Sequence, residues 1–152
     1  MTEAEQRAAV IAEARSWIST PYHHAADIKG AGVDCGMLLV RVYVDTGIVQ
    51  PFDPRPYPPD WNMHRSEERY LHEILTRTRE LKDDETCGPG DVIVWLHGRT
   101  FSHGGIVTDW PRIIHAYHMS QVVEECDLDR EIRLQFIGAN PRPTRRFSFW
   151  GS

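Results

Sequence analysis

The side chains best suited to nucleophilic chemistry are three cysteines, accompanied by eight histidines. Cys35 follows a glycine-bearing loop and opens an apolar run that we interpret as a buried helix. Because free N–H groups at a helix start favour a thiolate, we expect a lowered pKa for this thiol. Cys87 and Cys126 lie near acidic residues, which raise a thiol pKa. Cys35 is therefore the candidate nucleophile, with a buried structural cysteine as the alternative.

A thiolate enzyme also needs a general base, a task for which histidine is suited near neutral pH. His103 stands at the start of an expected strand, where Gly104 and Gly105 would leave open space beside it. His115 lies on the next expected strand, and a hairpin turning near residues 110–111 would set the two rings side by side. The second histidine could then orient the first. From spacing alone, two ordinary half-buried strand histidines remain the alternative.

Two other groups of residues contain metal-binding side chains, but their spacing gives little support for a metal site. His23, His24 and Asp27 are close in sequence but lack the paired spacing of a known zinc motif. A second set is more dispersed and less favoured still, comprising Cys87, His97, His118 and Cys126. We therefore expect no metal site.

The first half of the chain is predicted to be helical. Residues 3–18 have an amphipathic pattern that ends at Thr20-Pro21, and residues 22–34 are expected to form a loop. Cys35 to Thr46 is predicted to be a buried helix with Asp34 as its N-cap. Ser66 opens a further amphipathic helix, with one face formed by Leu71, Ile74, Leu75 and Leu81.

The second half is predicted to be β-structure. Apolar and β-branched runs separated by short breaks indicate strands at residues 92–96, 103–108, 112–117, 121–125 and 132–137. Helices followed by consecutive antiparallel strands define an α+β order. No linker separates the halves, so we expect residues 1–152 to form one domain.

Two segments outside this pattern are rich in ring side chains. The proline-rich residues 51–60 are expected to cross the surface irregularly. Arg142, Arg145 and Arg146 are expected to form a solvated basic tail. The aromatic residues beside them should dock on the domain itself or on a partner, namely Phe147, Phe149 and Trp150.

Composition narrows the class of protein. With 41% hydrophobic and 26% charged residues, the 152-residue chain is globular in composition. Its net charge of -5 argues against a nucleic-acid binder, whose footprint would be basic. No apolar run is long enough to span a membrane. The acidic N-terminus differs from a signal peptide, so we expect a chain that is cytoplasmic when synthesised.

Five short motifs resemble, in order, those of the NlpC-type cell-wall cysteine peptidases. They cover residues 7–137 and include the segments Thr20-Pro-Tyr, Gly32-Val-Asp-Cys-Gly, Gly88-Pro-Gly-Asp, Ser102-His-Gly-Gly-Ile and Arg112-Ile-Ile-His-Ala. Each motif is weak alone, whereas five in the right order are specific. The resemblance implies a papain-like α+β fold, with a central nucleophile helix packed on an antiparallel sheet.

The resemblance also implies roles for single residues. Cys35 would be the nucleophile, His103 the base and acid, and His115 the residue that orients it, while the Tyr22 hydroxyl would assist the oxyanion. Substrate contacts would come from His23, His24, Asp34 and Ser102. The usual Trp-Gly-Gly after the tyrosine is replaced by residues 23–26, in a loop that lines the substrate groove in the family.

The implied reaction is cofactor-free hydrolysis of a peptidoglycan stem-peptide amide, typically D-γ-glutamyl-diaminopimelate, through an acyl-enzyme. An amidase or acyltransferase on the same fold is an alternative, as is a structural tail component with weak activity. Gly36-Met37 replaces the common Ser-Gly and resembles variants encoded in phage tail modules. We therefore expect a phage or gene-transfer-agent tail protein as partner, which would carry the domain to the periplasm or cell wall.

Overall fold

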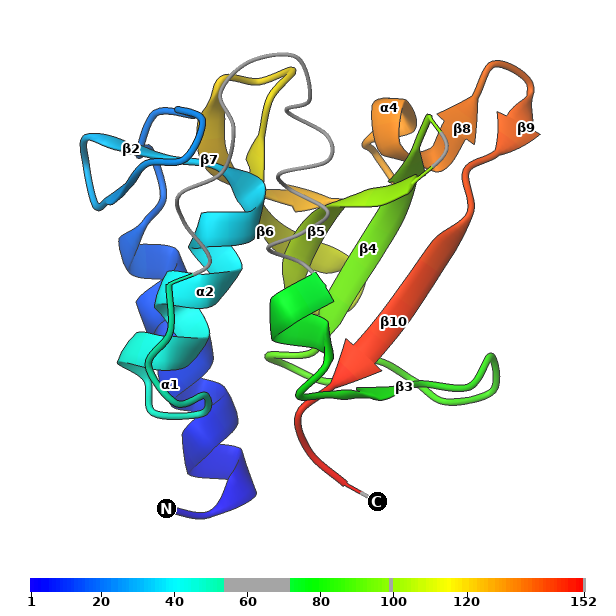
Figure 1. The fold of residues 1–152 in the computed structure, drawn as a ribbon. Coiled ribbons are helices and arrows are strands. Elements are labelled where there is room, and N and C mark those ends of the chain that lie inside the picture. Colours follow the sequence, from blue (N-terminus) through cyan, green and yellow to red (C-terminus); the bar gives the residue numbers. More distant parts are fainter. Residues whose placement is uncertain (54–71, 99, 152) are drawn as a thin grey trace.

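Two helices lie side by side against one face of a β-sheet (Figure 1). The computed structural model describes residues 1–53, 72–98 and 100–151. Helix α1 spans Glu3–Ser16 and helix α2 spans Cys35–Asp45. The α2 helix is apolar on nearly every side because it is enclosed between α1 and the sheet, and this confirms the predicted buried helix.

The sheet has six antiparallel strands in the order β3-β10-β4-β5-β6-β7. Their bounds are Arg79–Glu80 for β3, Val92–His97 for β4, Thr100–Asp109 for β5, Arg112–Tyr117 for β6, Val122–Asp127 for β7 and Thr144–Ser148 for β10. From β4 to β7 each strand pairs with the next along the chain, as consecutive hairpins do. The α+β order expected from the sequence is confirmed.

Local capping sets where the helices begin and end. Thr2 Oγ1 accepts from Glu5 N at 3.1 Å and starts α1. The helix stops at Ser16, two residues earlier than predicted, and Trp17 then turns into the core at 2% exposure. Asp34 starts α2, as predicted, because its Oδ1 accepts from Met37 N at 2.8 Å.

Two short hairpins lie where the sequence indicated other structure. Residues 22–34, expected to be a loop, contain β1 (Asp27–Ile28) paired with β2 (Gly32–Val33). The predicted strand at residues 132–137 is instead helix α4 (Ile132–Gln135) followed by β8 (Phe136–Ile137), which pairs with β9 (Asn140–Pro141). The apolar residues of this segment suggested a strand, but only Leu134 is buried.

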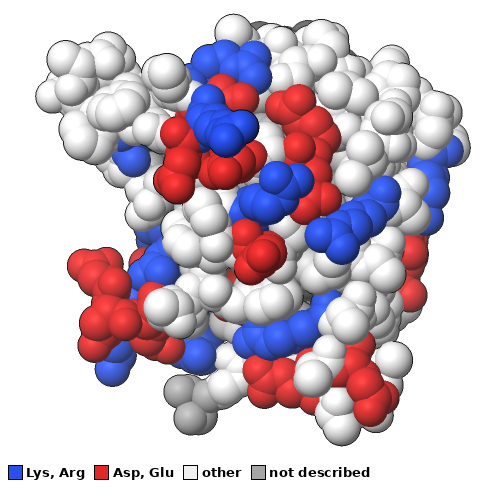
Figure 2. Space-filling view, turned by 180° about the vertical axis from the view of Figure 1, so that it is seen from behind, with Lys and Arg blue, Asp and Glu red and all other residues white. Residues whose placement is uncertain are grey.

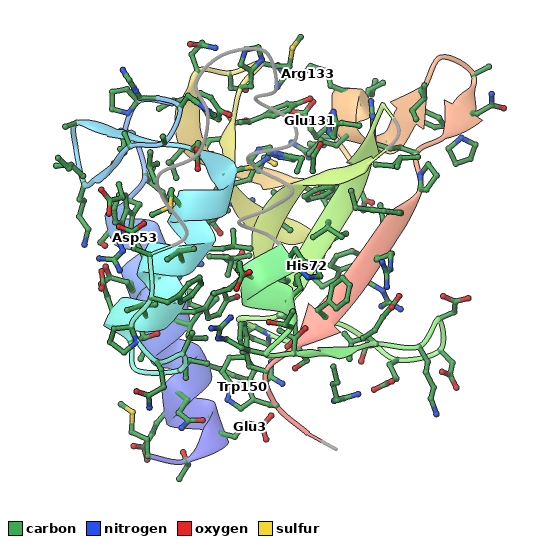
Figure 3. The ribbon with its side chains drawn as sticks, in the orientation of Figure 1. Glu3, Asp53, His72, Glu131, Arg133 and Trp150 are labelled. Atoms are coloured by element: carbon green, nitrogen blue, oxygen red, sulfur yellow. The ribbon has the colours of Figure 1, made fainter. Side chains whose placement is uncertain are left out.

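The predicted basic tail is not a free end, because Arg145 and Arg146 lie on the inner strand β10 between β3 and β4. The Arg145 side chain is exposed, as expected, whereas Arg146 is half-buried. Arg146 donates to the backbone oxygens of Lys82 and Glu85. Phe147 and Trp150 are 7% and 8% exposed within the main core, so the aromatic end docks on the domain itself. Trp150 lies near the start of α1 (Figure 3), where its Nε1 donates to a glutamine of that helix at 2.8 Å.

The predicted second amphipathic helix lies partly within the described residues. Ser66 and Leu71 lie outside the described residues, as do residues 54–60 of the proline-rich stretch. Residues 72–75 are helical, which agrees with the prediction over that range. Leu81, however, follows strand β3 and does not belong to the helix face, although it is buried.

Acidic and basic side chains are interspersed on the face seen in Figure 2, with no single-sign patch on that face. Several opposite charges of the described residues are paired, such as Arg15 and Arg112 with Glu125, and Arg145 with Glu80. Among residues 1–53, 72–98 and 100–151, no helix combines the length and apolar character needed to cross a membrane.

Candidate active site

Cys35 is the first residue of α2 and is completely buried. The Asp34 cap fixes the first turn of the helix, and the Cys35 thiol donates to Ser102 O of β5 at 3.5 Å. The sulfur therefore lies against the backbone of the strand that carries His103. The helix start and the strand are brought together because α2 packs on β5.

Burial raises the pKa of the Cys35 thiol, and the neighbouring Asp34 carboxylate raises the pKa further. Backbone N–H groups of Gly104, Gly36 and Cys35 act in the opposite direction. The lowered pKa expected from the helix start is thus wrong for the resting protein. Desolvation penalises the thiolate more than the helix end and its N–H groups favour it.

His103 and His115 are adjacent, as the hairpin prediction required. The β5–β6 register pairs Ile106 with Ile114, which makes the two histidines diagonal neighbours on one face of the sheet. His103 Nε2 lies 2.8 Å from His115 Nδ1. The space expected beside Gly105 is filled, since an added Cβ would lie 3.3 Å from atoms of Trp95 and Ile113.

Burial favours the neutral form of both rings. Burial, followed by the adjacent His115, holds the pKa of His103 well below its usual range. Burial also lowers the pKa of His115, although a hydrogen bond to Glu124 pulls that pKa upward. A neutral His103 has a ring nitrogen free to accept a proton, which is the state that a general base requires.

Glu124 is a site residue that the sequence analysis missed as a partner of the histidines. It pairs directly with His115 across β6 and β7, and its Oε1 lies 3.2 Å from His115 Nε2. The signal that could have located Glu124 is the register of the β6–β7 hairpin. That register cannot be read without knowing the turn, because a shift of one residue moves the side chain to the other face.

The thiol contacts β5 at Ser102, the residue before His103, and no hydrogen bond joins Cys35 to either histidine among the described residues. The Cys35 thiol bonds Ser102 O, whereas the Nε2 atom of His103 is occupied by His115. Nδ1 is therefore the His103 nitrogen left for the thiol. Catalytic contacts are commonly long in a protein without substrate and shorten in the complex.

The remaining candidates lie in the segment before α2. The Tyr22 ring packs partly buried against the core that contains Cys35, with the His118 ring edge-on at 5.6 Å. His23 is exposed, and His24 Nδ1 lies 3.9 Å from Asp34 Oδ2. The oxyanion role of Tyr22 and the substrate contacts of His23 and His24 stay predictions.

Asp34 and Ser102 are both buried. Asp34 Oδ2 accepts from Ala25 N at 2.8 Å, so this side chain joins the loop to the helix that carries the nucleophile. Ser102 Oγ has no hydrogen-bond partner among the described residues. Their assignment to substrate binding stays a prediction, and in this geometry Asp34 serves the chain itself. In the part of the chain that the structure describes, no group of three His, Cys, Asp or Glu side chains is arranged to hold a metal.

Solved structures with this fold include NlpC/P60 proteins and proteins named peptidoglycan hydrolases. NlpC2 from Trichomonas vaginalis superimposes with a TM-score of 0.68 at 16% identity, over 100% of this chain and 49% of its own. The NlpC/p60 domain of the peptidoglycan hydrolase SagA superimposes with a TM-score of 0.59 at 20% identity, over 91% of this chain and 96% of the SagA domain. The peptidoglycan hydrolase RipB from Mycobacterium tuberculosis superimposes with a TM-score of 0.62 at 14% identity, over 100% of this chain and 70% of the RipB chain.

These likenesses establish the papain-like α+β fold of NlpC/P60 proteins for this chain. The chain spans about half the length of the Trichomonas NlpC2 structure. No protein-family profile matches the sequence, and no curated protein sequence matches it. The fold is thus evident from structure at identities where sequence comparison finds nothing.

Proposed function

We propose that this chain is a cysteine peptidase that hydrolyses a stem-peptide amide of peptidoglycan, typically the D-γ-glutamyl-diaminopimelate bond. One observation carries the proposal: a helix-start cysteine abuts the strand whose histidine is held at 2.8 Å by a second histidine. Similar folds in proteins named peptidoglycan hydrolases supply the substrate class.

The reaction proceeds through a thioester. His103 Nδ1 takes the proton of the Cys35 thiol, and the thiolate attacks the amide carbonyl carbon. The tetrahedral oxyanion is stabilised by the Cys35 N–H, with the Tyr22 hydroxyl as a second donor. The C–N bond breaks as His103 returns the proton to the leaving amine. Water, deprotonated by His103, then attacks the thioester carbonyl carbon. The C–S bond breaks, the carboxylic acid product leaves, and His103 returns the proton to the Cys35 thiolate.

The decisive experiment is a digest of purified peptidoglycan with products read by mass spectrometry. The wild-type protein should release fragments with a free D-glutamate γ-carboxyl and a new diaminopimelate amino group. Cys35→Ala and His103→Ala should lose essentially all of this release, and His115→Ala should keep a small part. Cys87→Ala, which removes a thiol bonded to Arg146, is the matched control and should retain wild-type activity.

Other products would redirect the assignment to a different reaction on the same fold. Cleavage between the glycan and the peptide, or release of ammonia from a side-chain amide, would identify an amidase. Transfer of the acyl group to an added amine, with no net hydrolysis, would identify an acyltransferase. If no wall preparation yields a product and Cys35 is unreactive, the remaining assignment is a structural component of a tail.

Delivery by a phage or gene-transfer-agent tail is the finer part of this proposal. It rests on the resemblance of Gly36-Met37 to tail-module variants and on a net charge of -5, which provides no general attraction to anionic wall polymers. The aromatic end at Phe147–Trp150 no longer supports it, because those side chains pack in the core. Co-purification of the chain with tail particles tests the proposal, and a chain found only free of particles would contradict it.

A further inference from the structure

A continuous line of polar side chains crosses three strands of the sheet at the proposed active site. His103 on β5, His115 on β6 and Glu124 on β7 lie on one face, and each contacts the next. The two histidines are diagonal neighbours, whereas His115 and Glu124 are directly paired. The line ends at a carboxylate, which only accepts hydrogen bonds when ionised.

The carboxylate determines where the protons of both rings reside. Because Glu124 accepts, His115 must carry its proton on Nε2, and its Nδ1 is then an acceptor. His103 must in turn donate from Nε2, so its Nδ1 holds a lone pair. This is the tautomer in which His103 can take a proton from Cys35.

The opposite tautomer has its own candidate partner. Cys126 Sγ lies 3.6 Å from His115 Nε2, on the same strand as Glu124. A thiol donating to Nε2 would place the His115 proton on Nδ1. His103 would then accept at Nε2 and carry its proton on Nδ1, where it could not act as a base towards Cys35. The carboxylate is the closer and stronger partner, since charge-assisted bonds exceed those made by thiols.

We propose that Glu124 is a positioning residue that fixes the tautomer of both histidines, so that His103 presents an unprotonated Nδ1 to Cys35. The inference rests on the proposed function of this site. When the thiol proton moves to His103 Nδ1, the sulfur becomes a thiolate and the ring becomes an imidazolium. The imidazolium keeps its Nε2–H bond to His115, and the negative charge of Glu124 stabilises it through that ring.

Glu124 is itself held in place from helix α4. The Ser120 hydroxyl donates to Glu124 Oε1 at 2.9 Å, and Arg133 Nη2 donates to Ser120 Oγ at 3.1 Å. Glu131 holds Arg133 through two bonds of 2.7 Å and 2.8 Å. Figure 3 shows Glu131 and Arg133 next to each other by α4. The carboxylate is thus oriented by groups outside the sheet.

Several charges act on the pair and must be considered in any pH profile. The Glu124 and Glu131 carboxylates raise the pKa of His115, whereas Arg133 lowers it. The pKa of His103 is lowered by burial first, then by His115, His97 and Arg142. The Tyr117 ring stacks on His115, and burial raises the pKa of its hydroxyl. Glu124 is the acid that also makes a direct bond to the pair.

Histidine ¹⁵N NMR of the resting protein tests the proposal without any substrate. In the wild-type protein both His103 and His115 should be protonated on Nε2. Glu124→Gln should keep this tautomer, because the amide oxygen can replace the carboxylate. Glu124→Leu removes the acceptor and should shift His115 towards the Nδ1-protonated form. Cys126→Ala removes the competing partner and should leave the wild-type tautomer unchanged.

The rate of Cys35 alkylation by iodoacetamide as a function of pH provides the second readout. Relative to wild type, Glu124→Gln should react more slowly near neutral pH, because it removes the charge that stabilises the imidazolium. Glu124→Leu should react more slowly still, because it also removes the acceptor that fixes the tautomer. Glu125→Gln removes the same charge from the same strand without touching a histidine, and it should match wild type. Circular dichroism confirms that each variant is folded.

Two results would overturn the inference: a wild-type His115 protonated on Nδ1, or a folded Glu124→Leu with the wild-type tautomer and alkylation profile. Neither readout involves amide hydrolysis. A protein that cleaves no wall peptide but shows the expected tautomers would refute the proposed function and leave the role of Glu124 intact. If the wild-type protein cleaves wall peptides but the Glu124 variants keep the wild-type tautomers and alkylation profile, the proposed function stands and the role of Glu124 is refuted.

Discussion

Replacing Asp34 should have two effects that are seldom found together: lower stability and a more reactive Cys35. The two oxygens of this buried carboxylate accept from Met37 N and Ala25 N, both at 2.8 Å. Asp34→Asn can keep the cap with its amide oxygen but turns an N–H₂ group towards the Ala25 N–H. Leaving this part-buried donor unsatisfied costs roughly 1–3 kcal/mol.

Asp34→Ala loses the N-cap as well, which adds about 1 kcal/mol and brings the total to roughly 2–4 kcal/mol. For a domain of this length, each kcal/mol corresponds to a shift in melting temperature of about 2–4 °C. Both variants also remove a charge that raises the pKa of the Cys35 thiol. Alkylation near pH 8 should therefore be faster in Asp34→Asn than in wild type, despite the lower stability.

Urea unfolding and iodoacetamide kinetics measure the two effects separately. Asp45→Asn, which removes a charge from the exposed end of the same helix, is the matched control and should change neither quantity appreciably. The reasoning fails if Asp34→Asn is alkylated more slowly than wild type, or if both Asp34 variants are as stable as the control.

Three further changes test the packing and the buried histidines. Gly32→Ala should cost about 1–3 kcal/mol in urea unfolding, because its Cβ would lie 2.8 Å from the Cβ of His23; wild-type stability would contradict this. Phe147→Ala should cost about 3–5 kcal/mol, and a loss near zero would mean that β10 does not contribute to the core. Since folding lowers the pKa values of His103 and His115, the unfolded chain binds protons first as pH falls below about 6.5, and stability should decrease. His103→Gln should flatten that dependence between about pH 7 and pH 5, and an unchanged slope would refute the assignment.

The elements around the nucleophile could be predicted because local chemistry defines them. Asp34 is a strong N-cap, Gly47 provides a C-terminal stop at a positive φ of 79°, and the apolar run between them is long enough for a helix. The His103–His115 pair was likewise accessible, since one tight hairpin joins their strands and fixes how the rings face each other. Short-range patterns sufficed for these features.

The features that escaped prediction depend on long-range partners. Strand β10 (Thr144–Ser148) inserts between β3 (Arg79–Glu80) and β4 (Val92–His97), and nothing in its basic sequence indicates that these two much earlier strands would flank it. Arg146 is buried in part because backbone oxygens from the β3 side accept its hydrogen bonds. The polar line to Glu124 depends on strand register, and the raised pKa of Cys35 depends on burial; both are properties of the folded whole.

Burial raises the pKa of Cys35 and lowers that of His103, so it favours the neutral pair on both sides. Activation therefore depends on the groups that flank the pair. Backbone N–H groups, including that of Gly104, favour the thiolate, and Glu124 favours the imidazolium through His115. Asp34 opposes the thiolate because it adjoins the sulfur. Two carboxylates of equal charge thus act in opposite directions, and their Asn and Gln variants should shift the pH profile of alkylation to lower and higher pH, respectively. If both variants shifted the profile in the same direction, the overall charge, rather than the position of each carboxylate, would control the reactivity of the Cys35 thiol.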